Sequence, residues 1–189
     1  VAMARCEAAK ATIAKNMARQ VSKGVLTQEQ ADTALARIAL TASNGDFATA
    51  DLVIEAATEN EAIKGQIFAG LKDVLKPDAL LASNTSSISI TRLAAATGRA
   101  DRFCGLHFFN PVPLMALVEI IPGLATSSET TAAMQGFAAR LGKTAILAGD
   151  APAFIVNRVL CPMLNEAIFA LGDGVGSVVD IDTGLKLGA

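Results

Sequence analysis

The sequence predicts an α/β fold built around a mostly parallel sheet, and three observations lead to this prediction. Short, uniformly apolar segments alternate with longer segments whose apolar residues recur every three or four positions. Turn-forming glycine, proline and asparagine residues separate these segments. Buried strands that alternate with amphipathic helices are typical of parallel sheets with helices on both faces.

The predicted elements follow a regular order along the chain. The first forty residues are expected to form two helices, the second of which begins after Thr27, because Thr27 and Gln30 match a capping box. Strands are expected at 51–56, 79–83, 103–107, 117–121 and 144–147. Helices are expected at 61–75, 88–96 and 127–141, the first with a buried stripe of Ile63, Ile67, Leu71 and Leu75.

The pattern changes after Asp150, which places a predicted domain boundary near residue 150. Residues 154–171 are predicted to be one long apolar helix, and 179–187 a second helix. About forty helical residues are too few to bury a core of their own. We therefore expect residues 1–150 to be an α/β domain and residues 151–189 to be the beginning of an all-helical domain.

The composition excludes several classes of protein. The chain of 189 residues is 52% hydrophobic and 18% charged, unlike a disordered chain. Its 16 Lys and Arg residues against 18 Asp and Glu residues lack the basic surplus of a nucleic-acid binder. Three scattered cysteines indicate a reducing compartment rather than a disulfide scaffold. With a single histidine and no long apolar run, neither a metal site nor a membrane span is expected.

Small polar residues follow the second predicted strand, at the edge where open α/β sheets bind ligands. They form the segment Ser83-Asn84-Thr85-Ser86-Ser87. From the residues alone, the simpler interpretation is that Ser86 or Ser87 caps the next helix. Similarly, Glu59 and Lys64 fit a solvated helix start, and Asn157 fits either a helix surface or a cleft between domains.

The only histidine, His107, ends the third predicted strand, and Glu119 lies within the apolar fourth strand. A carboxylate in such a strand is costly to bury without a partner. His107 is the natural partner, and an Arg or Lys is the alternative. A histidine–carboxylate pair orients the imidazole ring and favours its charged form during proton transfer.

Four ordered segments together resemble the signature blocks of the L-3-hydroxyacyl-CoA dehydrogenases, in particular the bacterial 3-hydroxybutyryl-CoA dehydrogenases. The segments are Ser83 to Ser87, Gly105-Leu106-His107-Phe108-Phe109-Asn110-Pro111-Val112-Pro113, Val118-Glu119-Ile120-Ile121 and Phe154-Ile155-Val156-Asn157-Arg158. The resemblance implies NAD-dependent oxidation of a 3-hydroxyacyl-CoA, such as 3-hydroxybutyryl-CoA, to the 3-ketoacyl-CoA, in β-oxidation or butanoate metabolism.

The resemblance also implies roles for individual residues. His107 would be the general base, Glu119 would orient it, and Ser86 and Asn157 would hold the reacting oxygen or the substrate. The positions that match the cofactor contacts of the family are Glu59, Lys64, Ser86 and Asn110. The implied cofactor is NAD, with NADP as the alternative, and no metal is required. The implied partner is the acyl-CoA substrate, in a cytoplasmic homodimer without nucleic-acid or membrane partners.

In this family a strand and a G-x-G-x-x-G turn open a Rossmann-like domain. The chain contains no such turn, since Gly172 to Gly176 follow a predicted helix. We therefore expect a Rossmann-like sheet without its first βαβ unit, in a chain truncated at both ends that binds the dinucleotide weakly. Two alternative functions stay open: a dehydrogenase of a free hydroxy or sugar acid, and a non-catalytic packing or oligomerisation module.

Overall fold

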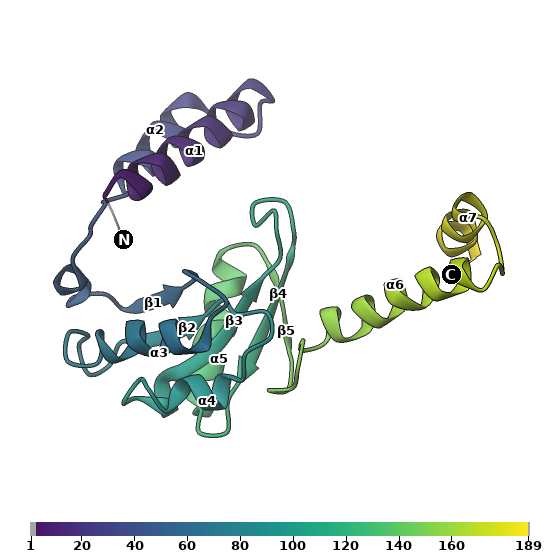
Figure 1. Cartoon of the computed structure of the whole chain (residues 1–189). Helices are drawn as coiled ribbons and strands as arrows, with labels where there is room; N and C mark the ends of the chain where they lie inside the picture. Colours follow the sequence, from purple (N-terminus) through teal and green to yellow (C-terminus); the bar gives the residue numbers. More distant parts are fainter. Residues whose placement is uncertain (1–2, 189) are drawn as a thin grey trace. The chain divides into compact units, whose positions relative to one another are not determined.

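A computed structural model describes residues 3–188, and the chain divides into two compact units, residues 1–49 and 50–189 (Figure 1). The first unit contains helices α1 (Met3–Ser22) and α2 (Gln28–Ala36) and a 3₁₀ helix, Asn44–Phe47. Thr27 caps α2, and the reciprocal hydrogen bonds between Thr27 and Gln30 confirm the predicted capping box. The Lys10 ammonium donates to the Ile38 carbonyl, which holds α1 against the end of α2.

The second unit is built on a five-stranded sheet whose strands lie in sequence order. The strands are β1 (Leu52–Glu55), β2 (Leu80–Ser83), β3 (Phe103–Phe108), β4 (Leu117–Pro122) and β5 (Thr144–Leu147). Neighbouring strands are parallel except for the antiparallel pair β3 and β4. The prediction of a mostly parallel sheet in an α/β fold is therefore confirmed.

Helices pack on both faces of this sheet. On one face, Met134 of α5 (Ser128–Arg140) joins a buried core with Ala82, Cys104, Leu106, Val118 and Ile120. The other face receives α3 (Glu61–Ala69) and α4 (Ile90–Ala94), and the Phe68 ring of α3 meets Phe103 edge-on at 5.1 Å. A 3₁₀ helix, Ala100–Arg102, precedes β3.

Side chains alternate between the two faces of a sheet along each strand. With the observed strand registers, the side chains that point to the face carrying α3 and α4 include those of Glu55, Ser83, His107 and Glu119.

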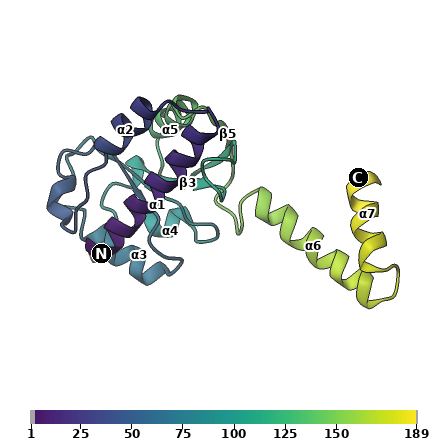
Figure 2. The same ribbon diagram turned by 90° about the horizontal axis from the view of Figure 1, so that it is seen from above.

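Two further helices complete the second unit. Helix α6 (Val156–Gly172) continues through Pro162, and α7 (Val178–Gly188) follows after a short turn (Figure 2). No residue of either helix is buried. Within residues 3–188, no helix combines the length and the apolar character that a membrane span requires.

Helix α3 differs from its prediction in both length and orientation. It ends at Ala69 instead of continuing to residue 75, and Arg99 donates to the carbonyl groups of the segment that follows, those of Lys72, Leu75, Lys76 and Ala79. The predicted stripe is wrong at Ile63, which is 46% exposed, whereas Lys64 is buried. The helix is turned so that the Lys64 ammonium pairs with the Glu55 carboxylate at the end of β1.

The N-terminus of α4 is closed by residues other than those predicted. Ser89 is its N-cap, so neither Ser86 nor Ser87 takes that role. Asp150 reinforces this cap, since its carboxylate accepts hydrogen bonds from the Ile90 and Thr91 backbone N–H groups at 2.8 Å and from the Ser89 hydroxyl at 2.9 Å. Partial burial acts to raise the pKa of Asp150, but these donors outweigh it and hold the pKa below its usual value.

Replacement of Asp150 by asparagine is expected to lower the free energy of unfolding by about 1–2 kcal/mol at neutral pH, because an amide cannot accept all three bonds. Since the folded state holds the Asp150 pKa down, its contribution is present above the unfolded pKa and is lost as the pH falls through the folded one. Urea denaturation should therefore show the two proteins converging below about pH 4. The exposed Asp182→Asn is the control, and a gap that is constant with pH would contradict this role.

Candidate active site

The centre of the candidate site is a buried pair formed by His107 and Glu119. The antiparallel register of β3 and β4 places the two residues directly opposite each other. The His107 Nδ1 atom lies 2.7 Å from Glu119 Oε2, and the two side chains are 5% and 0% exposed. The predicted partner of Glu119 is therefore confirmed, and the alternative of an Arg or Lys partner is excluded.

The other carboxylate oxygen of Glu119 binds the start of helix α6. Glu119 Oε1 accepts hydrogen bonds from the backbone N–H groups of Ile155 at 3.1 Å and Val156 at 2.9 Å. The chain approaches this point through Ala153 and Phe154, both with positive φ angles, of 65° and 55°. Such angles are costly for residues with a side chain, so this turn is a strained one.

Two aromatic rings lie beside the His107 imidazole. The Phe154 ring lies 5.6 Å from the imidazole, and the Phe109 ring lies 4.7 Å from it. Asn157 follows Val156 in the first turn of α6 and is half-buried. Glu119 therefore fixes both the imidazole ring and the backbone of the helix that carries Asn157.

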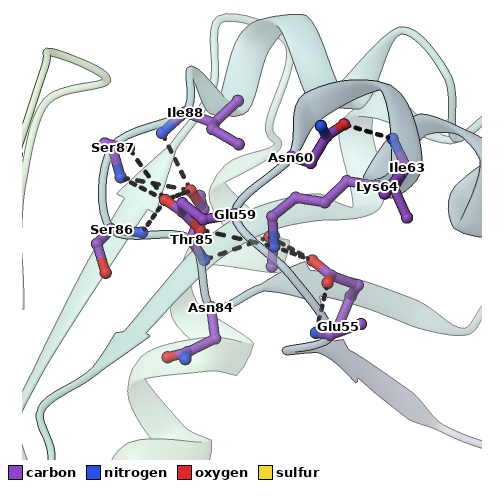
Figure 3. Close-up of polar contacts among 12 residues, drawn as sticks. Glu55, Glu59, Asn60, Ile63, Lys64, Asn84, Thr85, Ser86, Ser87 and Ile88 are labelled. Atoms are coloured by element: carbon purple, nitrogen blue, oxygen red, sulfur yellow. Dashed lines mark hydrogen bonds and ion pairs between the residues drawn. The ribbon is translucent and has the colours of Figure 1, made fainter.

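A second cluster surrounds Ser86, in the turn that follows β2 (Figure 3). One oxygen of Glu59, Oε1, accepts hydrogen bonds from the Thr85 hydroxyl, the Ser86 N–H and both the N–H and the hydroxyl of Ser87. Partial burial acts to raise the Glu59 pKa, but these donors and the nearby Lys64 charge lower it. The carboxylate therefore stays ionised and holds the turn.

Lys64 lies beneath this turn and is 1% exposed. Its Nζ atom is 2.5 Å from Glu55 Oε2 and 4.0 Å from Glu59 Oε2. The interpretation of Lys64 as part of a solvated helix start is therefore wrong. Glu55 was not among the predicted site residues, although a carboxylate that ends an apolar strand nine positions before a lysine is a detectable signal.

The Ser86 turn is also tied to the strand that carries His107. The Asn84 side-chain oxygen accepts a hydrogen bond from the Phe108 N–H at 2.8 Å. Asn110 follows two residues later, exposed and joined to Pro111 by a cis peptide bond. The loop beyond is held by Lys143, whose ammonium donates to the carbonyl groups of Val112 and Met115.

A polar hollow of about 250 Å³ opens at this edge of the sheet. It is lined by Ala56, Ala57, Thr58, Glu59, Lys64, Asn84 and Ser86. Three of the predicted residues, Glu59, Lys64 and Ser86, thus share one hollow, whereas Asn110 and Asn157 do not line it. Among residues 3–188, no cluster of His, Cys, Asp and Glu side chains has the makeup of a metal site.

Comparison with known proteins identifies the family of the chain. The NAD binding domain of 3-hydroxyacyl-CoA dehydrogenase matches residues 1–151, and the C-terminal domain of 3-hydroxyacyl-CoA dehydrogenase matches residues 154–189. The chain therefore belongs to the 3-hydroxyacyl-CoA dehydrogenase family, and the resemblance inferred from its sequence motifs is confirmed.

Individual proteins of known sequence or structure are also similar to the chain. The chain is 56% identical to the 3-hydroxybutyryl-CoA dehydrogenase of Bradyrhizobium diazoefficiens, over 98% of this chain and 63% of the relative. The crystal structure of (S)-3-hydroxybutyryl-CoA dehydrogenase from Ralstonia eutropha is 51% identical, with a TM-score of 0.92 over 94% of this chain and 63% of that chain. The solved structure of a diketoreductase, an enzyme described as catalysing reactions of dicarbonyl compounds, is 27% identical, with a TM-score of 0.93 over 100% of this chain and 68% of that chain.

Proposed function

We propose that the protein catalyses the reversible, NAD-dependent oxidation of (S)-3-hydroxybutyryl-CoA to the 3-ketoacyl-CoA. The observation that carries this proposal is the buried contact between His107 and Glu119 at the edge of the sheet where a ligand would bind. The names of two relatives, which are 56% and 51% identical to this chain over the aligned 63% of their own length, support the substrate class.

The proton is assigned to His107. Because the Glu119 carboxylate can only accept a hydrogen bond, His107 Nδ1 must carry the hydrogen between them. The Nε2 atom of the neutral ring then has a free lone pair, and it makes no hydrogen bond within residues 3–188. His107 Nε2 takes the proton from the 3-hydroxyl as the C3–H bond breaks and the carbonyl forms, and it returns this proton in the reverse direction.

Ser86 and Asn157 hold the substrate oxygen in this proposal. The Ser86 backbone is bound by Glu59, which leaves its hydroxyl free of hydrogen bonds in the part of the chain that the structure describes. The Asn157 amide offers both a donor and an acceptor from the first turn of α6. Holding the reacting carbon in place lowers the entropic part of the barrier.

We assign the polar hollow to the nicotinamide and ribose portion of NAD. Its lining offers the Glu59 carboxylate, the Ser86 hydroxyl and the Asn84 amide, which suit ribose hydroxyls and a carboxamide. We assign Glu59, Lys64, Ser86 and Asn110 to this side of the site, with NADP as the alternative cofactor. When bound, the nicotinamide supplies the acceptor for the hydride from C3.

The proposal extends to domains, assembly and compartment. We propose an NAD-binding domain over residues 1–150 and a helical domain from residue 151, which the separate matches to the two family domains support. We also propose a cytoplasmic homodimer. Free Cys6, Cys104 and Cys161 fit a reducing compartment, and exposed apolar residues on α6 and α7, such as Ile168 and Val179, fit a helical interface.

The test is to assay the natural full-length protein with NAD and either (S)-3-hydroxybutyryl-CoA or free 3-hydroxybutyrate. We expect kcat/KM to be higher for the CoA ester by a factor of roughly 10³ or more, because binding energy from the CoA portion contributes to turnover. Turnover of the free acid alone would contradict the proposal.

A second candidate function is the reduction of a dicarbonyl compound that carries no CoA. The structural likeness to the diketoreductase favours it. NADH oxidation measured with a diketo ester and with acetoacetyl-CoA distinguishes the two functions, since the first proposal expects the CoA ester to be the better substrate.

A further inference from the structure

We propose that Glu55 is a positioning residue of the active site. Through Lys64 it holds the Glu59 carboxylate against the Thr85–Ser87 turn, and so it fixes the position of Ser86. The kinetic consequence of this inference rests on the proposed function, whereas its structural consequence can be measured without any turnover.

Glu55 joins three elements at the edge of the sheet where their chains turn. It is 5% exposed and ends β1. Its Oε1 atom accepts a hydrogen bond from the Ala57 N–H at 2.7 Å, and its Oε2 atom accepts from the Ser83 hydroxyl at 2.8 Å. The Lys64 ammonium of α3 lies 2.5 Å from the same Oε2 atom. One carboxylate therefore links the ends of β1 and β2 to helix α3.

The Lys64 ammonium lies between two carboxylates, one much closer to it than the other. Its Nζ atom is 2.5 Å from Glu55 and 4.0 Å from Glu59, and a weaker contact with the Ser83 hydroxyl spans 3.4 Å. A buried ammonium without a counter-charge is strongly unfavourable. If Glu55 were neutral, Lys64 would have only Glu59 as an anionic partner, and we expect Nζ to move towards it.

That movement would compete with the bonds that hold the Ser86 turn. Glu59 Oε1 accepts the N–H groups of Ser86 at 2.9 Å and Ser87 at 3.1 Å, whereas Lys64 faces Oε2 (Figure 3). Figure 3 shows the Ser86 hydroxyl directed away from Glu59. A carboxylate drawn towards Lys64 would release the backbone of Ser86 and leave its hydroxyl without a fixed position.

The first experiment measures amide hydrogen exchange at Ser86 and Ser87 by NMR, in the natural full-length protein without ligands. In Glu55→Gln we expect exchange at both amides to be at least about tenfold faster, because their acceptor is displaced. The matched control is Glu61→Gln, which removes an exposed carboxylate at the start of α3, where it pairs with Arg92 of α4. Exchange in the control should equal that of the wild type.

The second experiment separates charge from packing with the double variant Glu55→Gln/Lys64→Met. Removing the ammonium as well as its partner leaves nothing to displace Glu59, so we expect the double variant to recover most of the protection lost in Glu55→Gln. If Glu55 served packing alone, the amides of Ser86 and Ser87 would exchange at least as fast in the double variant as in Glu55→Gln. This outcome would overturn the proposal.

The kinetic measurement follows from the same displacement. For (S)-3-hydroxybutyryl-CoA and NAD, Glu55→Gln is expected to lower kcat by about 10- to 100-fold with a much smaller change in the substrate KM. Glu61→Gln should keep the kcat of the wild type. An equal loss of kcat in both variants would overturn the positioning role.

Ser83→Ala keeps the proposal testable if Glu55→Gln does not fold. It removes little volume, but it removes a donor to Glu55 together with the oxygen that accepts from the Thr85 N–H and the Lys64 ammonium. Exchange at Ser86 and Ser87 is therefore expected to be faster than in the wild type, by less than in Glu55→Gln. Unchanged exchange in a folded Ser83→Ala or Glu55→Gln would overturn the inference. If the wild type shows no turnover but the amides of Glu55→Gln still exchange faster, the proposed function is contradicted and the positioning role is supported.

Discussion

Replacing His107 with alanine in the natural full-length protein is expected to lower kcat by roughly 10²–10⁴ without loss of the fold. The physical reason is the orientation of the ring: Glu119 binds Nδ1, and Nε2 is the atom left to accept the proton. No other histidine in the sequence can replace it. Without a base at this position, the hydroxyl proton would have to leave to water.

Steady-state kinetics in the oxidative direction measure this loss, and thermal unfolding of the same sample checks the fold. Imidazole added to the buffer provides a control, since it can occupy the space left by the ring and is expected to restore part of the activity. A variant with unchanged turnover would remove His107 from the mechanism. A low kcat with an early unfolding transition would assign the residue a structural role instead.

The pairing of His107 with Glu119 could be predicted because the sequence contains an unusual combination. A single histidine ends one apolar strand, and a carboxylate lies inside another that follows after a short loop. A buried carboxylate needs a partner. The antiparallel register then brings the two residues opposite each other, and no other detail of the structure is needed for this inference.

The burial of Lys64, in contrast, does not follow from the periodicity of its own helix. The periodicity of α3 is compatible with a buried stripe through Ile63, and a lysine is ordinarily assigned to the solvent face. The actual orientation depends on a charge outside the helix, that of Glu55 at the end of β1. Long-range pairing of this kind overrides local periodicity, because leaving either charge buried alone would cost more than exposing Ile63.

The contact between Glu119 and helix α6 was equally invisible in the sequence. Its donors are the backbone N–H groups of Ile155 and Val156, which every residue except proline possesses. No residue type therefore signals the contact. It depends on the positive φ angles of Ala153 and Phe154, which bring the first turn of α6 to the carboxylate and which neither residue type favours.

Glu119→Gln is accordingly expected to lower both activity and stability, because an amide has one acceptor where the carboxylate uses two. If the amide oxygen faces Ile155 and Val156, its NH₂ group meets His107 Nδ1 and forces the hydrogen onto Nε2, which abolishes the base. If the amide is reversed, its NH₂ group faces two backbone donors. We expect kcat to fall by roughly 10²–10⁴ and the free energy of unfolding to fall by about 1–3 kcal/mol.

A double-mutant cycle with His107→Ala separates these two effects. In the His107→Ala background, Glu119→Gln should cost little further activity, because its kinetic effect acts through the imidazole. The loss of stability should persist, because the bonds from Oε1 to Ile155 and Val156 do not involve His107. If Glu119→Gln lowered kcat in the His107→Ala background as much as in the wild type, Glu119 would have a role independent of His107. If the free energy of unfolding did not change, the stabilising contact between Glu119 and α6 would be contradicted. The two oxygens of one carboxylate thus make separable contributions, one to the base and one to the helix that carries Asn157.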